Sequence, residues 1–206
     1  MKTLRRILVL GLITIGAICA VAAIWLKSTG ISARPAPGAM EIAVARRARH
    51  FAIPEKARSL QSPVPSSPEV LAAGRRHFAD HCAGCHGNDG SGQTEMGANL
   101  YPRAPDMRLP QTQQLTDGEL YYIIQNGVRL TGMPAWGDGT PDDRQNWHLV
   151  LFVRHLPKLT PAELADMERY NPRSTAEQLK EQQEEEFLNA SPEKTKGPGP
   201  RKGESP

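Results

Sequence analysis

The apolar positions of this sequence fall into two patterns, an uncharged run near the N-terminus and helical stripes further along. The run covers residues 7–26 and contains no charged residue. At about 1.5 Å per residue it reaches the roughly 30 Å hydrocarbon thickness of a bilayer. Lys2, Arg5 and Arg6 precede it, so the positive-inside rule keeps the N-terminus in the cytoplasm. We therefore expect a single transmembrane anchor over residues 1–28, with the rest of the chain outside the cytoplasm.

A cleaved signal peptide is the alternative interpretation of the same segment. Residues 20–22 (Ala-Val-Ala) have the small-x-small form of a cleavage site. Against cleavage, Ile24 and Leu26 continue the apolar run past that point, and Trp25 lies where a helix would meet the membrane interface. Retention is favoured. The sequence thus predicts a single-pass protein of a bacterial inner membrane whose main domain faces the periplasm.

Helical patterns return after residue 66, each opened by a hydroxyl N-cap and an acid in the first turn. The expected helices run from about Ser66 to His81, from Thr116 to a C-cap at Gly127, and from Thr140 to Leu156. No stretch alternates apolar and polar residues over enough positions to indicate a sheet. The pattern predicts an all-α domain over residues 66–158.

The segments on either side of this domain differ in composition. Residues 29–65 are rich in Pro, Ala and Arg and are expected to form a basic linker. Within it, residues 41–51 have the pattern of a short helix near lipid headgroups, but a solvated, partly extended spacer is favoured. Residues 159–206 are expected to hold two short helices, opened at Thr160 and Ser174, and a disordered tail from Ser191 onward.

Composition narrows the candidate chemistry. The 206 residues include three cysteines, and an odd number argues against a disulfide framework. Cys19 lies in the apolar run, where it is interpreted as a small side chain facing lipid. The net charge is only +3, and no nucleic-acid partner is expected.

Cys82, Cys85 and His86 form the C-x-x-C-H pattern of covalent c-type haem attachment. This spacing lets two thiols reach the two vinyl groups on one edge of the macrocycle while the next imidazole turns beneath the iron. A redox dithiol would need a βαβ pattern, and a zinc site would need a fourth ligand, for which only His77 and His81 lie nearby. We expect one covalently bound haem c with His86 as the proximal ligand.

Electron-transferring haems usually carry a sixth ligand, and methionine sulfur is the common partner of histidine. Met133 is the best candidate, because it lies between two expected helices and is flanked by Gly132 and Pro134. The other methionines after the motif are Met96, Met107 and Met167. The first two fall in the loop that must wrap the haem edge, and the third lies beyond the core helices. We predict that His86 and Met133 are the two iron ligands.

On these motifs, residues 66–157 resemble class I c-type cytochromes, particularly the single-haem domains of bacterial oxidase and dehydrogenase subunits. The resemblance implies a small fold of three to five helices around one haem. Gly74 and Phe78 look like the positions where the family's N-terminal helix crosses its C-terminal helix, and Leu149 and Phe152 look like their partners. Close approach at a glycine and aromatic packing make such a crossing physically sensible.

The resemblance also implies that a proline carbonyl after the motif orients the proximal histidine. Pro102 and Pro105 are the candidates, and Pro102 is preferred. Residues 69–156 contain no lysine, so a docking face made from a ring of lysines is not expected.

The expected function is single-electron transfer between extracytoplasmic or membrane redox partners. The protein is expected to be an electron carrier rather than an enzyme, working with membrane respiratory complexes or as a subunit of one. The alternative is a haem enzyme or gas-sensing subunit whose sixth ligand is labile. Met133 separates the two, because a firmly bound sixth ligand favours electron transfer.

Overall fold

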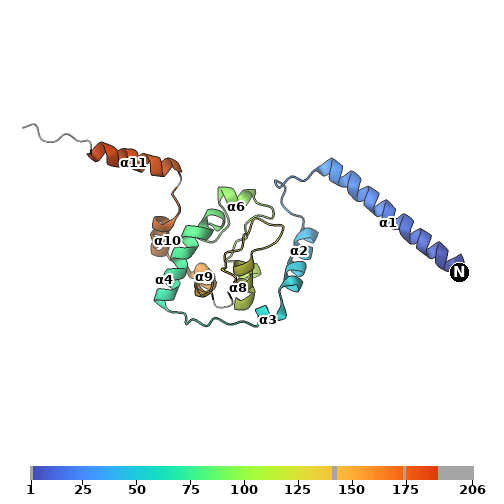
Figure 1. Ribbon diagram of the computed structural model, residues 1–206, viewed down its shortest axis with the longest axis horizontal. Coiled ribbons are helices and arrows are strands. Elements are labelled where there is room, and N and C mark those ends of the chain that lie inside the picture. Colours follow the sequence, from blue (N-terminus) through green and yellow to red (C-terminus); the bar gives the residue numbers. More distant parts are fainter. Residues whose placement is uncertain (1, 141–142, 174, 190–206) are drawn as a thin grey trace, which may run out of the picture.

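The computed structural model describes residues 2–140, 143–173 and 175–189, and every regular element in these ranges is helical. Figure 1 shows a group of short helices with one long helix extending to each side. The N-terminal helix α1 (Lys2–Thr29) has no buried residue, and its most apolar window has a mean hydropathy of 2.8. By length and composition α1 can cross a membrane, which agrees with the expected anchor.

The core is built on the crossing of α4 (Pro68–His77) with α9 (Arg144–His155). The hydroxyl of Ser67 caps α4 by accepting a hydrogen bond from the Val70 amide, as the sequence predicts. A Cβ on Gly74 would lie 2.3 Å from the carbonyl oxygen of His148, so only glycine permits this approach.

Aromatic packing continues the crossing beyond α4. The rings of Phe78 and Phe152 lie 5.2 Å apart between centroids, and both side chains are buried with Leu149 in one apolar cluster. The predicted crossing is therefore confirmed. The backbone that Gly74 meets belongs to His148, the neighbour of the expected Leu149.

Helix α8 (Asp117–Asn126) packs beside α9. Thr116 and Glu119 form a complete capping box at its start, and Gly127 ends it with φ of +64°, so both predicted boundaries are confirmed. The ring of Tyr121 stacks on that of Trp147 at 4.3 Å. This stack joins the second and third expected helices into one core.

The start of α9 differs from the prediction. The helix begins at Arg144, and the Asp143 carboxylate caps it by accepting from the amides of Gln145 and Asn146. Thr140 instead bonds back to Asp138 through its amide and hydroxyl, so it is not the cap. Pro141 and Asp142, which belong to the predicted start, lie outside the described residues.

The expectation of a partly extended spacer is wrong for much of residues 29–65. This segment forms α2 (Ala39–Ala52) and α3 (Glu55–Arg58), and α3 packs against α8. The Thr116 hydroxyl donates to the Arg58 carbonyl oxygen at 2.9 Å, and Ile53 is only 2% exposed. The region before the cysteine motif is therefore part of the folded domain.

The packed core also extends past residue 158. After η2 (Leu156–Lys158), the capping box of Thr160 and Glu163 opens α10 (Pro161–Met167), followed by η3 (Glu168–Tyr170). The Met167 side chain is fully buried in the apolar cluster. Burial of this residue anchors α10 on the core.

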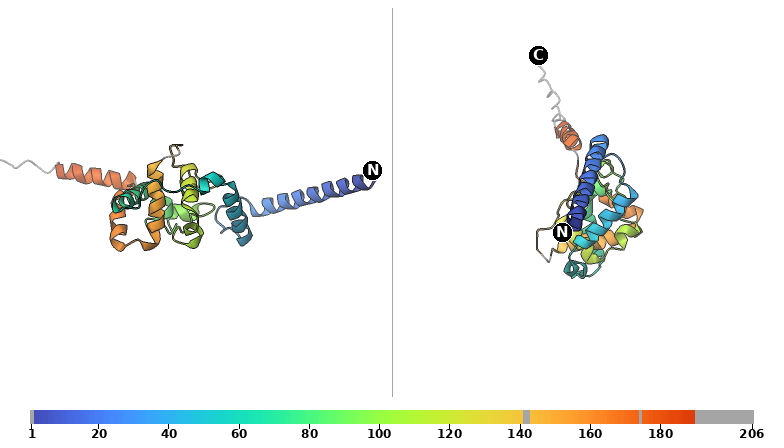
Figure 2. Two further views of the ribbon diagram at one scale, coloured as in Figure 1. Left: turned by 90° about the horizontal axis from the view of Figure 1, so that it is seen from below. Right: turned by 90° about the vertical axis from the view of Figure 1, so that its right-hand side faces the viewer.

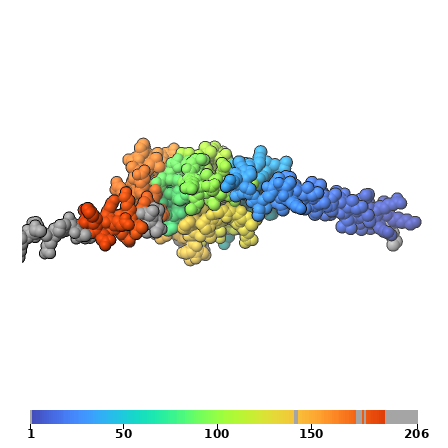
Figure 3. Space-filling model, turned by 90° about the horizontal axis from the view of Figure 1, so that it is seen from above, coloured from blue at the N-terminus to red at the C-terminus, as the bar shows by residue number. Residues whose placement is uncertain are grey.

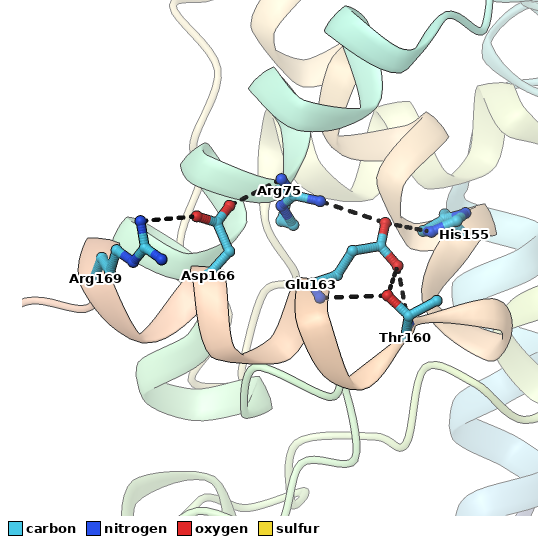
Figure 4. Close-up of polar contacts among 6 residues, drawn as sticks. All are labelled: Arg75, His155, Thr160, Glu163, Asp166 and Arg169. Carbon is cyan, nitrogen blue, oxygen red and sulfur yellow. Dashed lines mark hydrogen bonds and ion pairs between the residues drawn. The ribbon is translucent and has the colours of Figure 1, made fainter.

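A polar cluster fixes α10 to the crossing helices (Figure 4). The Arg75 guanidinium from α4 contacts Asp166 at 2.8 Å and Glu163 at 3.3 Å, and His155 from α9 contacts Glu163 at 2.9 Å. Burial opposes ionisation of Glu163, but bonds from Thr160 and His155 outweigh it and lower the pKa of this carboxyl.

Helix α11 (Thr175–Asn189) lies at the far end of the molecule from α1, as Figures 2 and 3 show. Its described side chains are exposed. The expected N-cap Ser174 and the expected disordered tail from Ser191 lie outside the described residues.

Candidate functional site

The cysteine pair lies where one helix changes its winding. After α4 the backbone makes a π-helical turn, η1 (Phe78–Cys82), in which the Ala83 amide donates to the Phe78 carbonyl oxygen. The chain then continues as α5 (Ala83–His86), ended by Gly87 at φ of +72°. Single π turns inside helices are frequently found at functional sites. Cys82 ends this turn, and Cys85 and His86 follow in α5. Both thiols are half-buried and unpaired with each other.

Thr94 holds this segment from the following loop. Its hydroxyl lies 2.8 Å from the Gly84 carbonyl oxygen and 3.0 Å from that of Cys85, and it also caps α6 (Glu95–Asn99) by accepting from the Gly97 amide. A Cβ on Gly97 would lie 2.1 Å from the Cys85 carbonyl oxygen, so α6 packs directly on the motif. Thr94 followed by Glu95 is an N-cap signal that can be recognised in the sequence.

His86 presents a half-buried imidazole whose Nδ1 atom is buried. Burial lowers its pKa, and the Pro105 carbonyl oxygen opposes that shift, so the ring is neutral at pH 7. Nδ1 is buried and makes no hydrogen bond of ordinary geometry, so the contact with Pro105 is looser than a full hydrogen bond. Neutral imidazole is the form that binds metals. The preference for Pro102 is therefore wrong, because Pro105 supplies the carbonyl that acts on the ring.

Burial of the thiols also affects their chemistry. Burial, with a smaller effect of the neighbouring Cys85, raises the pKa of Cys82 to about 12. In the closed fold this cysteine therefore carries almost no thiolate at neutral pH.

The methionines differ in their surroundings. Met133 is half-buried in the loop between α8 and α9, where its carbonyl accepts from the Val128 amide at 3.1 Å and its own amide bonds to Thr131. Met107 and Met167 are buried in the apolar core, whereas Met96 is 60% exposed. Met133 thus combines a fixed backbone with a side chain that is neither core filler nor free in solvent.

Two contacts join the Met133 loop to the region of the cysteine motif. The ring of Trp136 meets that of His81 edge to face at 5.3 Å, next to Cys82 in sequence. On the other side, a Cβ on Gly132 would lie 2.6 Å from the Leu100 side chain, which follows α6. The loop therefore closes against both the cysteine motif and the segment after it. The sequence gives no pairwise signal for either contact.

The described part of the chain lacks the frameworks that the other interpretations of the cysteine pair require. Residues 2–140, 143–173 and 175–189 contain no strand on which a βαβ dithiol site could be built. The same residues hold no group of three His, Cys, Asp or Glu side chains arranged around a metal ion. What the segment offers is two thiols and one neutral imidazole on consecutive turns.

The part of the chain that holds this segment is similar to known proteins. Residues 69–153 match the family model described as cytochrome C oxidase, cbb3-type, subunit III. The chain is 38% identical to the Cbb3-type cytochrome c oxidase subunit FixP of Rhizobium meliloti over 93 residues, covering 45% of this chain and 29% of that protein. It is 53% identical to the FixP subunit of Sinorhizobium medicae over 73 residues, covering 35% and 23%.

These matches are partial on both sides. The similarity spans less than a third of the length of the curated relatives. A chain of the reducing HAO-like protein complex of Kuenenia stuttgartiensis is also similar over 53% of this chain and 54% of that chain. Its TM-score of 0.41 and identity of 20% are too low to support an argument. The matched region includes α4, the cysteine motif, Met133 and nearly all of α9.

Proposed function

We propose, from the premise that residues 69–153 are a class I c-type cytochrome domain, that this protein carries one covalent haem c and transfers single electrons. The observation that carries the proposal is the helical segment that presents Cys82, Cys85 and a neutral, half-buried His86 together. No other described segment offers two thiols and an imidazole at this spacing.

The residues fit a haem in named roles. Cys82 and Cys85 would form the two thioether bonds, and His86 and Met133 would be the iron ligands. When bound, haem supplies a one-electron iron couple, which a thioether ligand stabilises in the ferrous form. Met133 is neutral, so it can contribute to a closed site without burying a charge. Phe78, whose ring lies 6.5 Å from that of His86, helps to exclude water from the proximal side.

Pro105 would position His86 for this task. A carbonyl oxygen near Nδ1 favours the tautomer with a proton on that nitrogen, which leaves the lone pair of Nε2 for the iron. The Gly92 amide donates to the His86 carbonyl oxygen at 2.7 Å and fixes the backbone beneath the ring. Together these contacts set the direction of the imidazole before any ligand binds.

The redox partners would be membrane respiratory complexes, and the chain would act as a subunit of one or beside one. The curated relatives are named as subunits of a cbb3-type cytochrome c oxidase, which supports this assignment. Lys2, Arg5 and Arg6, which precede the uncharged run of α1, support an inner-membrane anchor with the haem domain in the periplasm. The absence of lysine from residues 69–156 favours a docking face of other composition.

Replacement of Met133 by Ala tests the proposed function. The sulfur-to-iron charge-transfer band of the oxidised protein should disappear, the reduction potential should fall, and the ferrous protein should bind carbon monoxide. Haem should stay covalently attached and resist extraction by acidified organic solvent. Met96→Ala, at an exposed methionine, should leave all four properties unchanged.

Two outcomes would contradict the assignment. If the charge-transfer band persists in Met133→Ala, another group is the ligand. If the wild-type ferrous protein already binds carbon monoxide rapidly, the sixth site is labile and the protein is a haem enzyme or gas sensor instead.

A further inference from the structure

Helix α2 has two faces that make different contacts. On the inner face, Ile42 and Arg49 are half-buried, and Ile53 at the C-cap is 2% exposed. These residues lie on one side of the helix by its 3.6-residue period. This face packs against the haem domain.

Polar contacts fix the orientation of α2 on that domain. The Arg58 guanidinium donates to Nε2 of His50, and Nδ1 of His50 lies 2.9 Å from the carboxylate of Glu119, whose side chain is 5% exposed. At the other end of the helix the Tyr101 hydroxyl donates to Glu41. With both ends held, α2 cannot rotate to bury its opposite face.

The outer face of α2 is apolar and uncovered. Met40, Val44 and Phe51 are 81%, 60% and 89% exposed. Their spacings of four and seven residues place them on one stripe of the helix, opposite Ile42 and Ile53. An apolar stripe of this kind, next to charged residues, is typical of helices that lie in a membrane interface.

The position of α2 in the fold is also consistent with a membrane interface. Only residues 30–38 separate Thr29, the end of α1, from the start of α2, so α2 lies within about 30 Å of the end of the anchor. In Figure 1 and in the left view of Figure 2, α2 runs crosswise to α1, between α1 and the rest of the domain. A helix across the direction of a membrane-spanning segment, close to its end, lies parallel to the bilayer surface.

The charge around the stripe favours anionic lipid. Arg47 is exposed beside the stripe, three residues after Val44 and four before Phe51, and Arg46 is exposed on the side of Arg49. Lys27 lies in the last turn of α1, and Arg34 lies in the connection to α2. The single acid of α2, Glu41, is engaged by Tyr101. Basic side chains beside a membrane surface are attracted to anionic headgroups.

We propose that Met40, Val44 and Phe51 of α2 insert into the interface of an anionic bilayer, while the opposite face of the helix carries the haem domain. This lipid-binding surface goes beyond the proposed electron-transfer function. It mounts the domain on the membrane in one orientation, rather than leaving it on a loose tether. The haem domain would then bind its partners at a fixed distance from the bilayer surface.

Spin-label accessibility tests this proposal on the full-length holoprotein in lipid nanodiscs. In a Cys19→Ala background, labels are placed at Val44→Cys and Phe51→Cys, and a control label at Leu130→Cys, an apolar residue that is 95% exposed on the haem domain. Measurements use the reduced protein, whose low-spin ferrous haem does not relax the label. The discs contain either phosphatidylglycerol mixed with phosphatidylcholine or phosphatidylcholine alone.

The expected result is a several-fold higher ratio of oxygen to nickel-chelate collisions at the two α2 positions than at Leu130, larger in the anionic discs. The double substitution Arg46→Gln and Arg47→Gln should remove the part of this ratio that depends on phosphatidylglycerol. Absorbance spectra should show unchanged haem content and an unchanged charge-transfer band in every variant. A label at Met40→Cys replaces either α2 label that lowers haem content.

Two results would overturn the proposal. Ratios at Val44 and Phe51 equal to that at Leu130 in both lipids would show that α2 does not enter the bilayer. If the labels at Val44 and Phe51 are shielded from the nickel chelate in native membranes but not in nanodiscs, another protein covers the stripe. Either result leaves the assignments of His86 and Met133 untouched, because those are read from the haem spectrum.

Discussion

Gly74→Ala should destabilise the haem domain more than the addition of one methyl group suggests. The added Cβ would lie 2.3 Å from the carbonyl oxygen of His148 and 3.0 Å from the Cβ of Phe152. Because the first of these atoms is backbone, it cannot rotate away, and α4 and α9 must separate by about 1 Å. Overpacking of this kind costs about 1–3 kcal/mol and outweighs the gain of roughly 1 kcal/mol from placing Ala in a helix.

The separation also loosens the contact of Phe78 with Phe152, so we expect a net loss of about 2 kcal/mol. For a domain of this size that corresponds to a fall in Tm of roughly 10 °C, measured by far-ultraviolet circular dichroism of the holoprotein. Gly84→Ala is the matched control, since nothing lies within 4 Å of its added Cβ. If Gly74→Ala unfolds at or above the wild-type temperature with full haem content, the close crossing is not what this glycine provides.

Three further substitutions test the packing around the site. Arg75→Gln should cost about 1–3 kcal/mol in urea unfolding, because it removes the partly buried cation that contacts both Glu163 and Asp166. Arg169→Gln, at a side chain 76% exposed, should cost less than about 0.5 kcal/mol, and equal effects would contradict a structural role for the Arg75 contacts. The pKa of Glu163 lies below its ordinary value of 4.5 in the folded chain, so its contribution to stability is complete above about pH 4.5 and is lost as the pH falls through the folded value. Glu163→Gln should therefore flatten the acid limb of the stability curve, and an unchanged limb would refute the assignment. Thr116→Ala should cost about 1–2 kcal/mol through the lost cap of α8 and the lost bond to α3, while Thr116→Ser, which keeps both bonds, should be close to wild type.

Local signals explain which parts of the fold were predictable. Ser67, Thr116 and Thr160 each cap a helix where the sequence predicts, because the capping bond joins residues three apart and needs nothing from the rest of the chain. At α9 two capping residues stood three positions apart, and Asp143 rather than Thr140 took the role. Local chemistry alone does not choose between such neighbours.

Helix α2 shows where sequence reasoning is insufficient. Its charged residues favoured a solvated spacer, but the segment is helical and its bonds go to Glu119 and Tyr101, each far away in sequence. The cysteine motif could be recognised from the sequence because it is local, and the spacing of its residues is what haem attachment requires. Pro105 needed the fold, because only the path of the loop decides which proline carbonyl comes near His86.

The crossing of α4 with α9 also has a consequence for the timing of biosynthesis. The core cannot close until α9 exists, yet about 60 residues must still be made after the cysteine motif before His148 can meet Gly74. At typical rates of synthesis of about 5–20 residues per second, that delay is roughly 3–12 s. During this interval the chain is not yet folded, so the Cys82 thiol is exposed to solvent and has an ordinary pKa. In the folded domain, burial raises that pKa to about 12. For the covalent attachment proposed above, the order of elements along the chain thus sets a time window that ends when α9 has been made.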